Sequence, residues 1–231
     1  MSSTAIDGKL RTMPGVSSFP ALLEARATNK KQPNDKKYSV TQVFKKGGIT
    51  IGDKTYTQEQ LVMPLKKAVE DLITSKWPKG AKRPKLKLPF RDGKDYEDKE
   101  GYEEGDVFVQ FSRKESFGEP NDKDGFPVVG PRKDPKTGKF KSLTKKEIYP
   151  GIIGVVITKP FYWHNDEAAI KDGISFGLEG YQKVCDGVRL GGFDPITAEE
   201  EFEEFDVELV DEEIEGDDPS DATEVDFETE E

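Results

Sequence analysis

Apolar and polar residues alternate along several stretches of this chain, which predicts a mainly β protein. The clearest alternation runs from Lys37 to Lys45, where every second residue falls on one face of an extended strand. The same pattern recurs from 106 to 114, and the segment from 150 to 164 is rich in β-branched residues, which favour strands. The first structured element is predicted at 15–27, a short extended segment at 49–56, and a last strand or mixed segment at 174–184.

One segment has the period of a helix instead. Thr57 and Gln60 have the spacing of a capping box, and apolar residues follow at helical spacing from 61 to 73. Pro64 lies within this pattern, where a proline removes a hydrogen bond and clashes with the preceding turn. The regular helix is therefore expected to begin near Met63, with Pro64 in its first turn.

Three segments show no such period. Residues 1–13 are small and polar, and are predicted to form a flexible N-terminal arm. Residues 82–102 are rich in charge and turn formers, which indicates a surface excursion, and 116–146 is rich in Gly, Pro, Lys and Asp, which indicates a long loop. The folded domain is expected to span residues 14–193.

Charge divides the chain more sharply than hydrophobicity does. The 231 residues include 46 acidic and 35 basic side chains, a net charge of −11, yet no basic residue follows Arg189. Because 20 of the acidic residues lie from Asp194 to Glu231, the preceding part keeps 26 acids against all 35 bases and carries +9. An acidic block of this kind repels itself and buries too little apolar surface to fold. Residues 194–231 are therefore predicted to be a disordered acidic tail.

Aromatic residues are scattered through the acidic segment, as in short motifs that bind partner proteins. The residues expected to contact a partner are Phe202, Phe205, Asp226, Phe227 and Glu228.

The residues needed for common enzyme chemistry are missing. There is one histidine, His164, and one cysteine, Cys185, and the chain contains neither a P-loop nor a Gly-x-Ser-x-Gly elbow. We therefore expect no catalytic residues, no cofactor and no metal. The acids between Asp92 and Asp106 are interpreted as a solvated charged loop; a metal-dependent nuclease that uses them is the alternative from a different class.

The composition also indicates where in the cell the protein is located. A single cysteine fits a reducing cytosol, and neither a signal peptide nor a membrane-spanning stretch of apolar residues is evident. The protein is expected to be soluble and intracellular, with no membrane partner.

Cations and aromatic residues share the predicted strands, and this combination suits single-stranded nucleic acid. Lysine and arginine follow the phosphates, while each ring that stacks on a base contributes roughly 1 to 3 kcal/mol. Pro160 interrupts one strand, which indicates an edge or a bulge where large side chains stay exposed. Strand aromatics such as Phe44 and Phe111 could instead belong to the core. The candidate contacts are Lys37, Tyr38, Lys45, Lys46, Phe111, Arg113, Lys114, Lys159, Phe161, Tyr162 and Trp163.

The segment from Lys171 to Gly192 carries the pattern Gly-Leu-x-x-x-Gln-x-Val-x-Asp-Gly, and Tyr149-Pro150-Gly151 opens the strand before it. Together with residues 19–44, these motifs resemble a family of phage single-stranded DNA-binding proteins. The resemblance implies an oligonucleotide-binding (OB) fold, a five-stranded barrel, here with one helix and long loops. It also implies sequence-tolerant binding of single-stranded DNA in phage replication, recombination or repair, in the cytoplasm of the infected bacterial host.

The resemblance further implies that the acidic tail recruits phage replication proteins such as a polymerase or a helicase/primase. Such tails usually end on an aromatic residue, whereas Phe227 lies four residues before the end of this chain. A homodimer is compatible with this interpretation. A strand-annealing protein or recombination mediator is the closest alternative, while the charge of +9 before the tail argues against a DNA mimic.

Overall fold

The computed structural model describes residues 8–27, 33–79, 81–164 and 172–191. One helix, α1 (Gln58–Lys76), accompanies eleven strands, with 3-10 turns at Gly93–Tyr96, Glu115–Phe117 and Lys145–Glu147. The strands are β1 (Leu10–Arg11), β2 (Gly15–Ala27), β3 (Lys36–Phe44), β4 (Ile49–Ile51), β5 (Lys54–Tyr56), β6 (Phe90–Asp92), β7 (Val107–Lys114), β8 (Val128–Lys133), β9 (Phe140–Ser142), β10 (Ile153–Trp163) and β11 (Gly173–Cys185). The predicted tail, 194–231, lies outside the described residues, as do residues 1–7.

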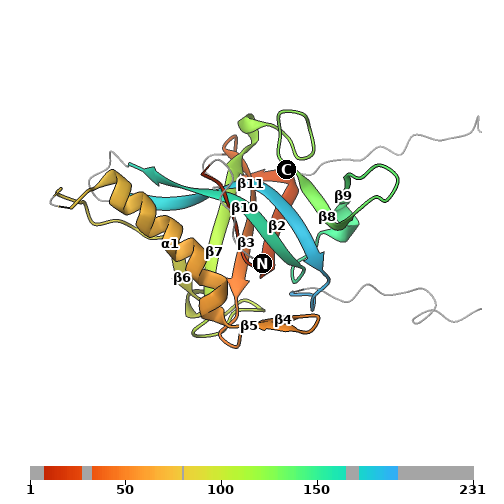
Figure 1. Cartoon of the computed structure of the whole chain (residues 1–231), viewed down its shortest axis with the longest axis horizontal. Coiled ribbons are helices and arrows are strands. Elements are labelled where there is room, and N and C mark those ends of the chain that lie inside the picture. The colour runs from red at the N-terminus through yellow and green to blue at the C-terminus, as the bar shows by residue number, and fades with distance from the viewer. Residues whose placement is uncertain (1–7, 28–32, 80, 165–171, 192–231) are drawn as a thin grey trace, which may run out of the picture. The chain divides into compact units, whose positions relative to one another are not determined.

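Five of the strands close into a ring. β2 pairs with β3, β3 with β7, β7 with β11, β11 with β10, and β10 returns to β2. Every pairing is antiparallel except that of β7 with β11, where Phe176 lies beside Phe111. This is the strand order of a five-stranded OB barrel, so the predicted fold is confirmed (Figure 1).

The remaining strands extend this barrel. β1 is added to β10, and β6 is added to β7. β8 pairs with β11 beyond the point where β7 leaves it, and β9 pairs with β8, while β4 and β5 form a separate ribbon. The core lies inside the ring, where Val40, Phe111 and Phe176 are fully buried.

Helix α1 packs its apolar face on the core. The predicted capping box is present: the Gln60 amide donates to Thr57 Oγ1 at 3.3 Å, and the Thr57 amide donates to Gln60 Oε1 at 3.0 Å. The expected start near Met63 is wrong, because the helix begins at Gln58 and continues through Pro64. Leu61 and Leu65 on either side of Pro64 are fully buried, and this packing outweighs the hydrogen bond that the proline removes.

The prediction of a flexible N-terminal arm over residues 1–13 is wrong for residues 8–13. Leu10 and Met13 are buried, and the Leu10–Arg11 strand pairs with β10. The Thr12 hydroxyl accepts a hydrogen bond from the Val156 amide at 2.9 Å and lies 3.1 Å from Gln42 Oε1. Residues 8–13 therefore belong to the folded body.

Both segments predicted to be irregular contain strands. The 82–102 excursion holds β6, and the 116–146 loop holds β8 and β9. β6 and β9 are each three residues long, too short for a period to show, and they form because distant strands supply their hydrogen bonds. Buried Phe126 and Leu143 fix the second segment to the barrel.

Candidate nucleic-acid interface

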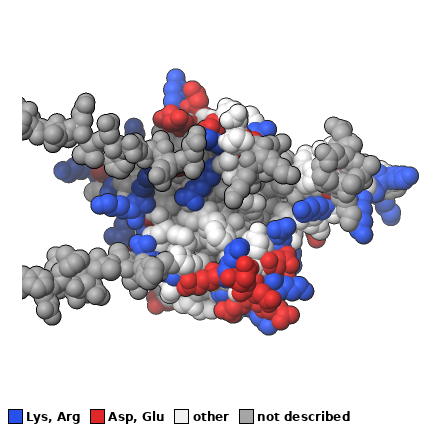
Figure 2. Space-filling view, turned by 180° about the vertical axis from the view of Figure 1, so that it is seen from behind, with Lys and Arg blue, Asp and Glu red and all other residues white. Residues whose placement is uncertain are grey.

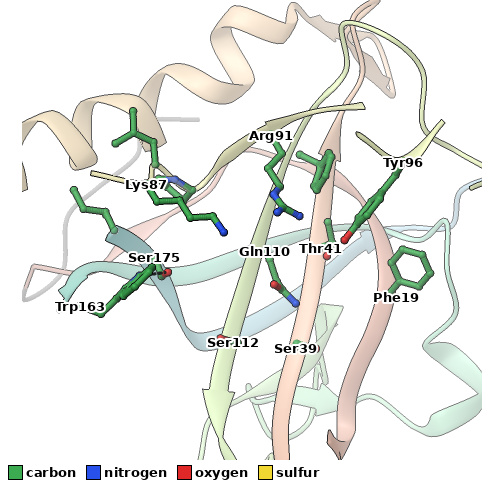
Figure 3. A pocket seen from close by; sticks show the side chains of 14 residues that line it. Phe19, Ser39, Thr41, Lys87, Arg91, Tyr96, Gln110, Ser112, Trp163 and Ser175 are labelled. Atoms are coloured by element: carbon green, nitrogen blue, oxygen red, sulfur yellow. Dashed lines mark hydrogen bonds between the residues drawn. The ribbon is translucent and has the colours of Figure 1, made fainter. Parts of the chain in front are cut away.

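A cleft of about 360 Å³ lies on the outer face of β3 and β7. Alternate residues of a strand face opposite sides, so Val40 and Phe111 face the core, while Ser39, Thr41, Gln110 and Ser112 face out and give the cleft a polar floor (Figure 3). In OB folds, the face of these two strands binds oligonucleotides and oligosaccharides.

Trp163 stands at one end of this cleft (Figure 3). Its indole Nε1 donates to Ser175 Oγ at 2.9 Å, which fixes the ring. The ring also lies against Gly173, where an added Cβ would come within 2.4 Å of Trp163 Cζ2. A side chain at position 173 would therefore displace the indole, so the sequence of β11 positions the ring in the cleft.

Phe19 and Tyr96 stand at the opposite end (Figure 3). Phe19 is 50% exposed, and its ring stacks on that of Tyr102 with centroids 6.3 Å apart. Its φ of +46° is an outlier for a bulky residue, and it lies in a register irregularity of β2. The sequence places Phe19 in the first predicted structured element, 15–27, without separating it from the core residues. Pro20, a proline within a strand, was the available sign of a bulge.

Two cations reach the cleft from the segment that was predicted to be a surface excursion. Lys87 is fixed to β11 through its backbone, since its amide donates to the Asp172 carbonyl at 2.7 Å and its carbonyl accepts from the Ile174 amide at 2.9 Å. Arg91 extends from β6, with its guanidinium carbon 6.0 Å from the centre of the Phe108 ring. Within the described ranges, neither residue forms an ion pair. Sequence reasoning missed both cations because β6 was not predicted.

A second cleft of about 510 Å³ continues from the first and shares Ser112, Trp163 and Ser175 with it. Phe161, which is 44% exposed, and Phe117 contribute rings to this second cleft. We call the two clefts together the groove. Trp163 thus occupies the middle of the groove, with exposed aromatic rings toward both of its ends.

The second cleft also contains charged residues. Lys114 is exposed and forms no ion pair among the residues described, whereas Lys37 pairs with Asp35 at 3.1 Å. Arg113 Nη1 lies 3.5 Å from Glu179, and its Nη2 donates to the Phe117 carbonyl. The Arg113 Nε is buried without a hydrogen-bond partner in the described part of the chain.

The structure thus brings five of the predicted contacts together in the groove. They are Lys37, Arg113, Lys114, Phe161 and Trp163. They lie in a groove that can take a nucleic-acid strand, and their contact with DNA stays a prediction.

Tyr162 faces the other way, because alternate residues of a strand point to opposite sides. Its ring packs edge-on against Trp77 with centroids 5.2 Å apart, and Lys76 Nζ lies 4.4 Å above it. The Tyr162 hydroxyl donates to Asp172 at 2.5 Å, and this hydrogen bond raises the pKa of the phenol. Tyr162 therefore supports the end of α1 and does not line the groove.

The predictions for Tyr38 and Phe111 are corrected by their burial. Tyr38 is 4% exposed and packs against Phe126, and Phe111 is fully buried beside Phe176. Burial also raises the pKa of the Tyr38 hydroxyl. Both rings occupy inward positions of their strands, where no base reaches them.

Lys45 is part of an internal network. Its Nζ lies 2.7 Å from Asp106 Oδ2, and the fully buried Asp106 also accepts hydrogen bonds from the Lys46 and Glu103 amides at 2.8 and 3.1 Å. Lys45 therefore holds the loop before β7. Lys46 and Lys159 are exposed, and neither lines either cleft.

The carboxylates considered for a nuclease have structural partners. Asp92 accepts hydrogen bonds from the Lys94 and Gly105 amides at 3.0 and 3.2 Å, and these bonds lower the pKa of its carboxyl. Asp106 forms an ion pair with Lys45. Across the described residues, no three His, Cys, Asp or Glu side chains come together as a metal site would require.

The surface charge is uneven. Figure 2 shows Lys and Arg gathered toward two sides of one face, with uncharged surface between them and a compact group of Asp and Glu at its lower edge. None of the helices that the structure describes is long and apolar enough to cross a membrane. The predicted partner contacts Phe202, Phe205, Asp226, Phe227 and Glu228 lie outside the described residues.

Comparisons with known proteins agree with this architecture. The single-stranded DNA-binding protein of bacteriophage Enc34, solved in complex with single-stranded DNA, is 18% identical, with a TM-score of 0.54 over 80% of this chain and 90% of that one. The same phage protein in a separate structure is 16% identical, with a TM-score of 0.50 over 84% of this chain and 89% of that one. No curated protein sequence is similar enough to count as a match.

A family profile described as the ssDNA-binding protein of Enterobacter phage Enc34 matches residues 8–214, which include the barrel and the beginning of the acidic segment. The chain therefore belongs to the family of the Enterobacter phage Enc34 ssDNA-binding protein.

Proposed function

We propose that this chain binds single-stranded DNA in the groove without reading its sequence, and that it protects and organises such strands in phage replication or recombination. The observation that carries the proposal is the groove itself, in which the rings of Phe19, Phe161 and Trp163 lie among cations that form no ion pair with a described residue, over a polar floor.

The exposed rings favour a single strand over a duplex. In a duplex, the faces of the bases are covered by their neighbours, so a ring gains nothing by approaching them. In a single strand, each base offers a free face, and stacking contributes roughly 1 to 3 kcal/mol per base. Phe161 and Trp163 are two residues apart on β10 and therefore face the same side of the strand.

The cations suit a phosphate backbone. Lys87, Arg91 and Lys114 line the groove and form no ion pair with any described residue, so they are available to replace counterions around phosphates. Stacking and phosphate contacts are both insensitive to base identity. The floor offers hydroxyls and one amide, too few groups to read a sequence, so binding without sequence preference follows.

Tryptophan fluorescence tests this proposal directly. Trp163 is expected to be quenched when a single-stranded oligonucleotide binds, and Trp163→Ala is expected to weaken binding by about 1 to 3 kcal/mol with the protein still folded. Trp77, which packs on Tyr162 outside the groove, is the internal reference. A Trp163→Ala protein that loses its cooperative melting transition would show that the indole serves the fold instead.

We also infer a role for the acidic segment. Residues 194–231 combine 20 carboxylates with scattered aromatics, which is the chemistry of a ligand for basic partner proteins. We propose that they recruit phage replication proteins, such as a polymerase or helicase/primase, in the cytoplasm of the infected cell. Phe227→Ala is expected to weaken capture of the polymerase while leaving DNA affinity unchanged; equal loss of both would contradict the proposal.

A further inference from the structure

The outer part of the hairpin formed by β8 and β9 has side chains that the folded core does not require. Every residue from 131 to 142, here called the basic hairpin, is exposed, and the residues that fix its base, Val128 and Leu143, lie outside this range. Figure 1 shows the hairpin projecting from the barrel. Its side chains add nothing to the core, so their chemistry is free to serve another purpose.

The hairpin is nevertheless well formed. Lys133 is paired with Phe140, and the Asp134 amide donates to the Lys139 carbonyl at 2.8 Å. Asp134 Oδ1 accepts hydrogen bonds from the Lys136 and Thr137 amides at 2.6 and 3.1 Å. The one carboxylate of the hairpin is therefore used to shape its tip.

The remaining charge is all positive. Among the described residues, none of the hairpin's cations forms an ion pair, and Lys133 Nζ lies 5.4 Å from the centre of the Phe140 ring. The cations are Arg132, Lys133, Lys136, Lys139 and Lys141. Five cations on one projecting ribbon, with a single acid already engaged, match a polyanion.

The geometry points to duplex DNA as that polyanion. We propose that the basic hairpin binds the backbone of a duplex adjoining the single strand in the groove, so that the protein prefers junctions between single-stranded and double-stranded DNA. A duplex carries one charge per about 1.7 Å of its axis, and its major groove admits a two-stranded β-ribbon. The hairpin residues line neither of the two clefts, and the hairpin's five cations accompany a single exposed ring, Phe140, so its chemistry is suited mainly to phosphates.

The hairpin and the groove share strand β11. Glu179 lines the groove, and Gln182, three residues later on the same strand, pairs with Val129 at the base of the hairpin. Three residues of a strand span about 10 Å, so one DNA molecule can reach both surfaces. The inference rests on the proposed function, since it assumes a single strand in the groove.

The test compares three DNA ligands: a duplex with a single-stranded tail, the tail strand alone, and the blunt duplex. A tail of about 16 nucleotides covers the range of site sizes that single OB folds bind. The full chain is compared with a Lys136→Gln, Lys139→Gln, Lys141→Gln variant. A matched control replaces three exposed lysines elsewhere and changes the net charge equally: Lys54→Gln, Lys66→Gln, Lys67→Gln.

We expect the unmodified chain to bind the tailed duplex about tenfold more tightly than the tail alone, and the hairpin variant to lose this preference while binding the tail normally. The salt dependence on the tailed duplex should fall by about 0.9 in log–log slope for each phosphate contact removed. The inference is overturned if the hairpin variant keeps the preference, or if the control variant loses it equally. If the unmodified chain does not bind the tail strand at all, the proposed function itself fails.

Discussion

Two substitutions of Phe19 distinguish its effect on the stability of the protein from its effect on DNA binding. Its φ of +46° strains the backbone of a residue with a Cβ, at a cost of about 1 to 2 kcal/mol, and its ring is half exposed at one end of the groove. Glycine adopts this conformation freely. Phe19→Gly therefore relieves the strain, whereas Phe19→Ala keeps it, and both remove the ring.

The magnitudes can be worked from the contacts of the ring. Loss of the pairs with Tyr102 and Tyr96 costs about 0.5 to 1.5 kcal/mol each. Glycine offsets part of that cost by relief of strain, so Phe19→Gly is expected to be about 1 kcal/mol more stable than Phe19→Ala, the reverse of their usual order in a strand. If the ring stacks on a base, both variants should bind single-stranded DNA about 5- to 150-fold more weakly, equivalent to 1 to 3 kcal/mol.

Urea denaturation followed by circular dichroism measures the first difference, and fluorescence polarisation with a labelled oligonucleotide measures the second. Wild-type affinity in both variants would refute the stacking role of Phe19. An Ala variant more stable than the Gly variant would refute the strain argument.

Three further predictions concern charge. Glu179→Gln should tighten single-strand binding and steepen its salt dependence, because Arg113 and Lys9, each 3.5 Å from the Glu179 carboxylate, are released toward phosphates; an unchanged slope would argue against this. Asp106→Ala should lower the free energy of unfolding by about 1 to 3 kcal/mol, since it leaves the Lys45 ammonium and the Lys46 and Glu103 amides without their acceptor; an unchanged urea midpoint would contradict the structural role of this carboxylate. If the 20 carboxylates of residues 194–231 compete with phosphates for the groove, deletion of this segment should tighten DNA binding most at low salt, because the Debye length falls from about 10 Å at 0.1 M to about 3 Å at 1 M; equal affinity at low salt would exclude competition.

The strands of the barrel were predictable where burial imposes a long alternation. β3 and β7 each direct alternate residues such as Val40 and Phe111 into the core, so a period of two appears in the sequence. β6, β8 and β9 could not be predicted from a sequence period, because they are short and are held by pairing with other strands of the sheet. The helix start predicted from Pro64 was wrong for a related reason. Tertiary packing around Leu61 and Leu65 outweighs the tendency of proline to end a helix.

The groove was predictable only in part. Pro160 correctly indicated an exposed aromatic residue, Phe161. Only the alternation of β10 separates Phe161 and Trp163, which line the groove, from Tyr162, which packs on Trp77 at the end of α1. Lys87 and Arg91 reach the groove because β6 pairs with β7, a long-range event that leaves no local signal. Charge and aromatic content thus predict that a binding surface exists, while the register of the sheet decides which residues form it.

The central claim is that the groove selects single strands by stacking and phosphate contact. Its most direct test is titration of the full chain with a single-stranded oligonucleotide and with the duplex of the same sequence, at a series of salt concentrations. The account predicts much tighter binding to the single strand, with a log–log salt slope of about −2 from Lys87, Arg91 and Lys114 at roughly −0.7 per phosphate. Equal affinity for the duplex, or affinity for the single strand that does not change with salt, would contradict it.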